Sequence, residues 1–304
     1  MGMRFVRGIG FGVVLIALAA TVADGHVPDW QKAAGGKRTF EVASVKRSGP
    51  DSAQGDLSLD AADNYFHTGG LFTANATLIN YIIFAYRITD SSQYPLIQAQ
   101  LPKWAQTEPF YMDARAEGNP TKDEVRLMMQ ALLAERFKLV LHTETRQLPA
   151  YLLELDKPGT LGAKLNPRLE DGLCTVAPEK PAPNAKAPAS RAYCGLIFSP
   201  AEELLRMNIM GYTMQQMAGA LSTAGTYAGG LEALPIVDET GLTGKYDIEL
   251  TFVRVRRGSA DSQADVVGTT FIEALKKQGG LRLVKQVAPV EVYVVDHVER
   301  PSEN

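Results

Sequence analysis

Cysteine and histidine are scarce in this sequence, which has two Cys and four His among 304 residues. So few potential ligands exclude a scaffold built on several zinc ions or on many disulfides. Positive charge is not in excess either, because 31 Lys and Arg stand against 34 Asp and Glu, for a formal net charge of −3. Domains that bind nucleic acid usually carry a basic face, so the composition gives no support for nucleic acid as a partner.

The common catalytic motifs are also missing. The sequence has no Gly-x-Ser-x-Gly elbow, no Ser-x-x-Lys pair and no His-Glu-x-x-His zinc helix. The segment from Gly241 to Lys245 only superficially resembles a phosphate-binding loop, because its two glycines are too close together and no Ser or Thr follows the lysine. We therefore assign no catalytic, cofactor-binding or metal-binding residue, and we favour a protein that is not an enzyme.

A long uncharged stretch occurs only at the N-terminus. Residues 1–7 contain two Arg and no acid, and residues 8–23 are uncharged and largely apolar. Small residues precede two candidate cleavage points, after Ala19 and after Ala23. This pattern is typical of a secretory signal peptide over residues 1–23, and an uncleaved membrane anchor is the alternative. We expect a secreted or periplasmic protein with no membrane span after cleavage.

The two cysteines lie in and beside a segment whose composition is typical of a linker. Residues 158–193 are rich in Pro and Ala, which is typical of an extended and exposed connection. Export would bring Cys174 and Cys194 into an oxidising compartment, where we expect them to form a disulfide. A metal pair or a reactive thiol is the alternative. The linker separates a first unit over residues 38–157 from a second over residues 194–304.

The two units share a pattern when the chain is shifted by 136 positions. Thr77 then coincides with Thr213, and each Thr precedes apolar residues at helical spacing. The segment Phe110–Ala116 coincides with Tyr246–Phe252, and both alternate apolar and polar residues as half-buried strands do. Two matches at one offset favour an internal repeat of a single fold.

Each unit continues with a second helix and an apolar segment that contains a proline. Thr121 and Glu124 have capping-box spacing in the first unit, and Gly279 marks a helix end in the second. Because Pro149 and Pro289 interrupt the apolar segments, each segment is expected to fold into a two-stranded hairpin. The expected strands are Phe40–Val45, Leu71–Ala74, Phe137–Leu141, Tyr151–Leu155, Leu205–Tyr212, Leu281–Val284 and Val290–Val295. The predicted class is α+β, with two tandem strand-helix-strand-helix-strand-strand units, each a small mixed sheet with helices on one face.

Several motifs together resemble a known family. They are Phe40–Lys46, Phe72–Leu78, Leu132–Leu139, Val237–Asp247, Pro289–Glu299 and the chain end. In combination they are similar to the acidobacterial soil-associated secreted protein family, which is built on a domain of unknown function and is also found fused to antirepressor-type membrane metallopeptidases. The resemblance covers about residues 38–304. It implies export and a role in sensing or binding, and it assigns no activity.

One loop in the second unit is a candidate interaction site. It contains two acids and two glycines just before a strand, which would suit a cation or a glycan. A tight turn that places the next strand in register is the alternative, and we favour it. The residues of this loop are Asp238, Glu239, Thr240, Gly241, Thr243, Gly244 and Lys245.

His142 and Glu144 form a second candidate site. In a strand they share one face, where they read either as a solvated polar surface or as a pair for proton transfer, and we favour the polar surface. Asp296 and His297 are adjacent and would point to opposite faces of a strand, which argues against a catalytic pair there.

These patterns favour a secreted or periplasmic binding, sensing or protein-interaction module. Its partner would be an unknown envelope protein or extracellular ligand. The alternative is an extracytoplasmic hydrolase that acts on cell-wall or extracellular polymer with carboxylates of the Asp238 loop and with His142. Acids clustered in one cleft would favour the hydrolase, whereas an uncovered sheet edge would favour binding.

Overall fold

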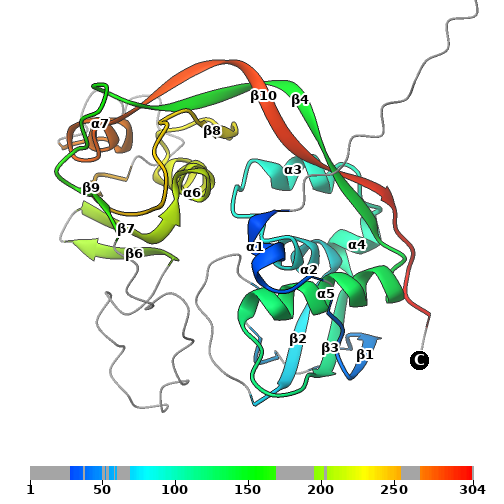
Figure 1. Ribbon diagram of the computed structural model, residues 1–304. Coiled ribbons are helices and arrows are strands. Elements are labelled where there is room, and N and C mark those ends of the chain that lie inside the picture. The colour runs from blue at the N-terminus through cyan, green and yellow to red at the C-terminus, as the bar shows by residue number, and fades with distance from the viewer. Residues whose placement is uncertain are drawn as a thin grey trace, which may run out of the picture.

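A computed structural model shows two lobes joined by a long two-stranded ribbon (Figure 1). The proposed signal peptide and both cysteines lie outside the described residues, so the signal and the disulfide stay predictions. The structure describes residues 28–36, 38–49, 52, 55–57, 59, 69–168, 195–201, 204–254 and 268–302.

The first lobe is built on an antiparallel sheet in the order β1–β3–β2. Its elements are α1 (Asp29–Ala33), β1 (Val42–Arg47), β2 (Leu71–Thr77), α2 (Leu78–Ala85), α3 (Gln93–Gln98), α4 (Lys103–Thr107), β3 (Pro109–Arg115) and α5 (Lys122–Arg136). Phe110, Met112 and Ala114 of β3 are all buried, because every second side chain of a strand points to the same face. Helices α2 and α5 lie on that face and share its hydrophobic core (Figure 1).

The second lobe is built on a four-stranded antiparallel sheet in the order β5–β9–β7–β6. Its elements are β5 (Leu165–Pro167), β6 (Gly195–Ala201), β7 (Leu204–Thr213), α6 (Met214–Ala228), β9 (Lys245–Phe252) and α7 (Phe271–Lys277). The alternating residues Tyr246, Ile248, Leu250 and Phe252 of β9 are buried, and they pack against α6 and α7 in a second hydrophobic core.

The helix starts that the sequence predicts are confirmed. Thr121 begins α5 with a capping box, in which its hydroxyl accepts from the backbone N–H of Glu124 and the Glu124 carboxylate accepts from the N–H of Thr121. Thr213 and Gln216 form the same box at the start of α6. Thr77 also stands at the N-cap of α2, although its side chain makes no capping hydrogen bond.

The proposed repeat has a counterpart in the strand register. Thr77 lies opposite Pro109 in the first lobe, and Thr213 lies opposite Lys245 in the second, which is the same pairing at the offset of 136. A third strand also joins in the same way, β1 beside β3 and β5 beside β9, and the second sheet differs by the additional strand β6 beside β7. The agreement therefore concerns β1 with β2–α2–β3 and β5 with β7–α6–β9, and a common fold for the whole units stays a prediction.

The hairpins predicted after α5 and α7 are wrong. Strands β4 (Val140–Leu155) and β10 (Leu281–His297) each run on past their proline and pair with one another, antiparallel, along nearly their whole length (Figure 1). The units therefore do not end in the predicted strand-strand pair of their own. Each contributes one long strand to a ribbon that spans both lobes.

The positions of the two prolines explain why the strands continue. The N–H of Tyr151 donates to the carbonyl of Pro235, on the side of β4 away from β10. Pro149, two residues earlier, has its nitrogen on that same side, and Pro289 lies opposite Gln147 at an equivalent position. A proline whose nitrogen points away from the partner strand removes no hydrogen bond of the pair, so it is tolerated there.

The ribbon carries side chains into both hydrophobic cores. Tyr293 and Val295 pack against the core of the first lobe, whereas Leu153 and Leu281 belong to the core of the second. A short strand, β8 (Ile236–Asp238), pairs with β4 in parallel and makes this third sheet mixed. The α+β class is confirmed, and no described helix is long and apolar enough to cross a membrane.

Candidate functional site

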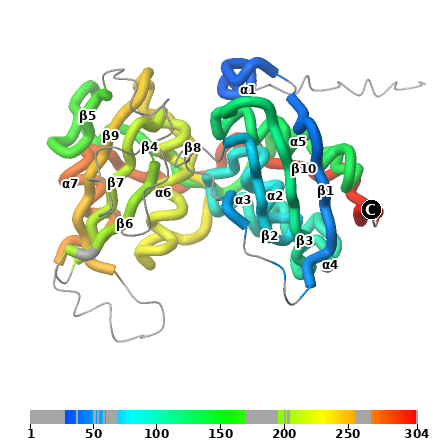
Figure 2. The backbone as a smooth tube through the Cα atoms, turned by 90° about the horizontal axis from the view of Figure 1, so that it is seen from below, coloured from blue at the N-terminus to red at the C-terminus, as the bar shows by residue number. Residues whose placement is uncertain are grey.

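The first sheet has an outer face that no described helix covers (Figure 2). Val42, Arg115 and Leu71 lie side by side on this face, one on each strand, because Val42 and Leu71 both pair with Arg115. Val42 is 68% exposed and Leu71 is 58% exposed, and they are the two most exposed large aliphatic side chains of this lobe in the described part of the chain. Two bare apolar side chains on either side of an arginine make a surface that suits a partner.

The sheet also has a free edge at β1. The N–H of Ser48 donates to the carbonyl of Pro109, so the even-numbered residues of β1 direct their backbone groups to β3. Ala43, Val45 and Arg47 therefore direct theirs outward. Within the described residues, the carbonyl of Ala43 is the one group of these with a recorded partner, the guanidinium of Arg136 at 3.3 Å.

Other strand edges of the same lobe are covered. The outer edge of β2 accepts backbone hydrogen bonds at Thr73 from Asp56 and Leu57. On β10, the side-chain amide of Gln93 donates to the carbonyl of Glu291 (3.1 Å). The structure thus leaves β1 as the more open described edge of the first sheet, with a side-chain hydrogen bond at the carbonyl of Ala43 alone.

Gln100 completes the cover of β10. Its amide nitrogen donates to the carbonyl of Tyr293 (3.0 Å), and its amide oxygen accepts from the N–H of Val295 (3.0 Å). The side chain of Gln100, two residues after the end of α3, thus takes the place of a neighbouring strand. Covering an edge in this way is one means by which proteins protect an exposed strand.

The Asp238 loop forms a tight turn at the end of β8. One carboxylate oxygen of Asp238 accepts from the N–H and from the hydroxyl of Thr240, at 2.9 and 2.7 Å. Gly241 and Gly244 both have positive φ, at +68° and +87°, which other residues rarely adopt. The acid of Asp238 is thus engaged within its own turn, as in an Asx-turn.

His142 lies on the ribbon with a partner that the sequence did not indicate. Its Nδ1 is 2.6 Å from a carboxylate oxygen of Asp296, across the two strands, whereas Glu144 pairs with Arg146. The His142 and Asp296 side chains are 45% and 43% exposed, and ion pairs so open to solvent contribute little.

The two sequence-predicted sites are far apart. Asp238 lies beside Leu153 of β4, eleven residues along the strand from His142. At about 3.3 Å per residue this is roughly 36 Å, so the two side chains cannot act on one bond. Among the described residues, no three His, Cys, Asp or Glu side chains are placed to hold a metal ion.

Sequence reasoning missed a partly buried acid between the lobes. Asp90 follows α2 and faces α6, where the hydroxyl of Thr223 donates to the carbonyl of Thr89 (3.1 Å) and accepts from the N–H of Ser91 (3.3 Å). Burial raises the pKa of Asp90, against the opposing effect of hydrogen bonds from Ser92 and Ser222.

The close approach at this junction depends on Gly219 of α6. A Cβ there would lie 2.9 Å from the hydroxyl of Thr89 and 3.3 Å from the nitrogen of Asp90. The spacing of Gly219, Ser222 and Thr223 puts three small residues on one side of α6. That stripe was the available signal for a helix face that another segment approaches closely.

Three tyrosines stand near this partly buried acid. The rings of Tyr86 and Tyr293 meet edge to face, with centroids 6.4 Å apart. Burial raises the pKa of Tyr86 to about 12, and it also raises the pKa values of Tyr94 and Tyr293. These phenols stay neutral at physiological pH, so the cluster is a packed junction and supplies no activated nucleophile.

A family model described as a protein of unknown function (DUF3738) matches residues 79–298. This span is more than two thirds of the chain; it begins inside α2 and ends just after β10, so β1 and β2 lie outside it. No curated protein and no solved structure matches the chain.

Proposed function

We propose that this chain, which belongs to the DUF3738 family of proteins of unknown function, is an exported binding protein that takes an extended segment of a partner protein onto the edge of β1. The proposal includes the secretory signal over residues 1–23, the Cys174–Cys194 disulfide and an origin in soil bacteria. The partner would be another envelope or extracellular protein. The chain would act by binding, without catalysis.

The free edge of β1 is the observation that carries the proposal. Ala43, Val45 and Arg47 point backbone donors and acceptors outward, in the alternating pattern that an added strand requires. When a peptide adds to a sheet edge, main-chain hydrogen bonds supply affinity and the side chains at alternate positions supply specificity.

The side chains beside this edge define the partner segment. Val42 and Lys46 lie on the same outer face of β1, four residues apart, and Lys46 has no ion-pair partner among the described residues. A segment with an apolar residue opposite Val42 and an acid opposite Lys46 would match both. We therefore expect partner strands with an apolar and an acidic residue at positions i and i+4.

A displayed library of peptides, selected on residues 24–304, tests this proposal. Enriched peptides should be extended sequences with the apolar and acidic residues four apart. Ala43→Pro removes an outward N–H without removing a bond to β3, so it should abolish binding while β1 stays paired. Lys46→Glu should weaken acidic peptides about tenfold, and Lys103→Glu, at an exposed lysine of the same lobe, should leave them unchanged.

Two results would contradict the proposal. One is a set of enriched peptides that bind the folded Ala43→Pro variant as tightly as the wild type. The other is a stable dimer of the mature chain, in sedimentation at micromolar concentration, that Ala43→Pro dissociates. In that case the edge would be occupied by a second copy of the chain and would not be open to a different partner.

A further inference from the structure

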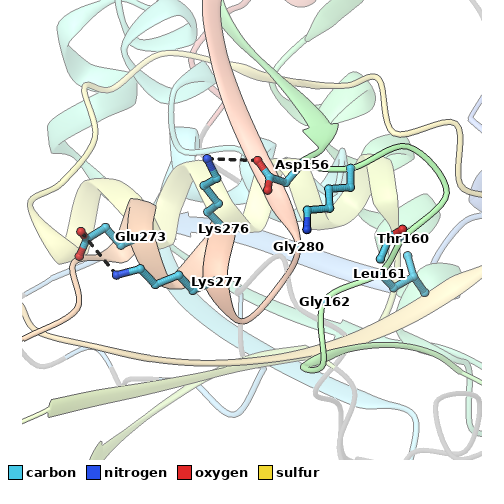
Figure 3. A pocket seen from close by; sticks show the side chains of 9 residues that line it. Asp156, Thr160, Leu161, Gly162, Glu273, Lys276, Lys277 and Gly280 are labelled. Atoms are coloured by element: carbon cyan, nitrogen blue, oxygen red, sulfur yellow. Dashed lines mark ion pairs between the residues drawn. The ribbon is translucent and has the colours of Figure 1, made fainter.

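A pocket in the second lobe, remote from β1, collects lysines from two elements (Figure 3). Its volume is about 500 Å³, which is in the range of small-molecule sites. One wall is the segment that follows β4, and the other is the C-terminal half of α7. The lining residues are Asp156, Lys157, Thr160, Leu161, Gly162, Glu273, Lys276, Lys277 and Gly280.

The floor of the pocket is bare backbone. A Cβ on Gly162 would overlap the backbone of Gly279 and Gly280, and a Cβ on Gly280 would overlap that of Gly162, so the two segments can meet only because Gly162 and Gly280 lack side chains. The N–H of Gly162 donates to the carbonyl of Gly279 (3.2 Å) and ties the walls together. The hollow is therefore built into the fold, and a side chain at either glycine would force the two segments apart.

The rim carries more positive than negative charge. It has three lysines against two acids, Asp156 and Glu273, which gives a formal charge of +1. Lys157 is exposed and has no ion-pair partner among the described residues. Because Lys157 lies on the wall opposite α7, positive groups approach the hollow from two sides.

The two acids on the rim are held weakly. The amine of Lys276 is 3.3 Å from Asp156 and that of Lys277 is 3.8 Å from Glu273 (Figure 3). Both lysines are at least 60% exposed, and such pairs contribute little to stability. A bound anion could replace either acid as the partner of its lysine at small cost.

The end of α7 does not compete for these lysines. Lysines in the last turn of a helix often serve only its unpaired carbonyls and its dipole. Here the carbonyls of Ala274, Leu275 and Lys276 accept from the N–H groups of Gln278, Gly279 and Gly280, respectively. The recorded partners of the two amines are therefore the weakly held acids and not the end of the helix.

We propose that this pocket binds a small organic anion with two or more carboxylate or phosphate groups, one held by Lys157 and another by Lys276 or Lys277. The hydroxyl of Thr160 is placed on the rim to donate a further hydrogen bond, and Leu161 offers a small apolar contact. The site is separate from β1, so this proposal does not depend on the proposed strand addition.

Calorimetric titration of residues 24–304 with citrate and with pyrophosphate tests the site, and amide chemical shifts locate the binding. The two probes distinguish carboxylate from phosphate ligands, and sucrose is the neutral control. At least one anion should bind saturably, shift residues 156–162 and 273–280, and weaken as salt rises. Lys157→Gln should weaken it about tenfold, since it removes a charge-assisted hydrogen bond.

Two further variants make the outcome decisive. Asp156→Asn frees Lys276 from its partner and should strengthen binding about threefold, a gain that a misfolded variant would not show. Lys103→Gln, at an exposed lysine of the first lobe, should change nothing. The proposal is overturned if neither anion saturates up to about 10 mM with the wild type and Asp156→Asn, or if Lys103→Gln weakens binding as much as Lys157→Gln does.

Discussion

The outer faces of the two sheets differ in how their charges are used. On the second sheet, the guanidinium of Arg168 holds both carboxylate oxygens of Asp247, at 2.9 and 3.0 Å, and Lys164 pairs with Glu249. On the first sheet, the corresponding face presents Val42 and Leu71 to solvent. Both sheets alternate buried and exposed residues in the same way. The outer face of the second sheet is nevertheless covered by ion pairs, whereas that of the first exposes apolar side chains. We infer that the first face is available for binding and the second serves stability.

Asp247 shows what the closed face stabilises. Its carboxylate also accepts from the N–H of Gly211 (2.7 Å), at the bulge where the register of β7 against β9 shifts. Gly211 has a φ of +72°, which a glycine adopts without strain. The ion pair therefore fixes the shape of β7, whereas the contacts on the outer face of the first sheet are a hydroxyl bond from Ser48 to Asn75 and an exposed pair of Arg115 with Glu41.

The largest effect is expected where the two lobes touch. Gly219→Val should lower the free energy of unfolding by about 2–3 kcal/mol, because its side chain would collide with Thr89 and Asp90. Gln215→Val, at an exposed position of the same helix, controls for helix propensity. Chemical denaturation measures both. Equal effects of the two variants would mean that the lobes do not depend on this contact.

A smaller loss is expected on the closed face. Asp247→Ala should cost about 2 kcal/mol, because it leaves the largely buried Arg168 and the N–H of Gly211 without their acceptor. Asp113→Ala, on the open face, should stay within about 0.5 kcal/mol. Urea denaturation of both variants tests the contrast between the sheets. Similar losses would show that the two faces do not differ in this way.

The turn after β8 should depend on its glycines more than on its acid. Gly241→Val or Gly244→Val should cost more than about 1 kcal/mol, because β-branched residues are strained at positive φ. Asp238→Asn should stay within about 0.5 kcal/mol, since the amide oxygen can still accept from Thr240. The test is denaturation of all three variants. Loss of ligand binding in Asp238→Asn alone would make this loop a binding site.

The smallest effect concerns the pH dependence at the junction. Because burial raises the pKa of Asp90, the folded protein holds its proton more tightly than the unfolded chain does. Stability from this group is therefore greatest in acid and falls as pH rises from about 4, the ordinary value, through the raised pKa. Asp90→Asn should be more stable than the wild type at pH 7, by up to about 1 kcal/mol.

The same comparison at pH 3 is the control. There Asp90 is protonated in both states, so the advantage of the asparagine should vanish. Thermal unfolding at the two pH values measures the difference. An advantage of equal size at both pH values would show that the substitution acts through packing and that ionisation of Asp90 does not affect stability.

The local elements were largely predictable, because their signals lie within a few residues. The capping box of Thr121 and Glu124 marked the start of α5, and alternation in Phe110–Ala116 and Tyr246–Phe252 marked β3 and β9. The tight turn at Gly241 and Gly244, where both have positive φ, was indicated by the glycines and acids of the loop. Each of these depends on contacts between near neighbours, which sequence periodicity records directly.

The candidate sites were less predictable, because distant segments form them. Asp90 gave no local sign of burial, since the helix that covers it lies some 130 residues later in the chain. The free edge of β1 likewise follows only from which strands fail to pair with it. The lysines around the α7 pocket come from two segments more than 100 residues apart, so no motif joined them.

The sequence by itself determined the α+β class, the helix starts and the buried faces of individual strands, because hydrophobic period and capping act over one or two turns. Tertiary structure alone decided that β4 and β10 pair with each other in place of two separate hairpins. The local pattern around Pro149 and Pro289 suits either arrangement. The choice depends on which pairing lets the ribbon bury side chains in the cores of both lobes. That burial involves residues far apart in the chain, so local sequence patterns do not record it.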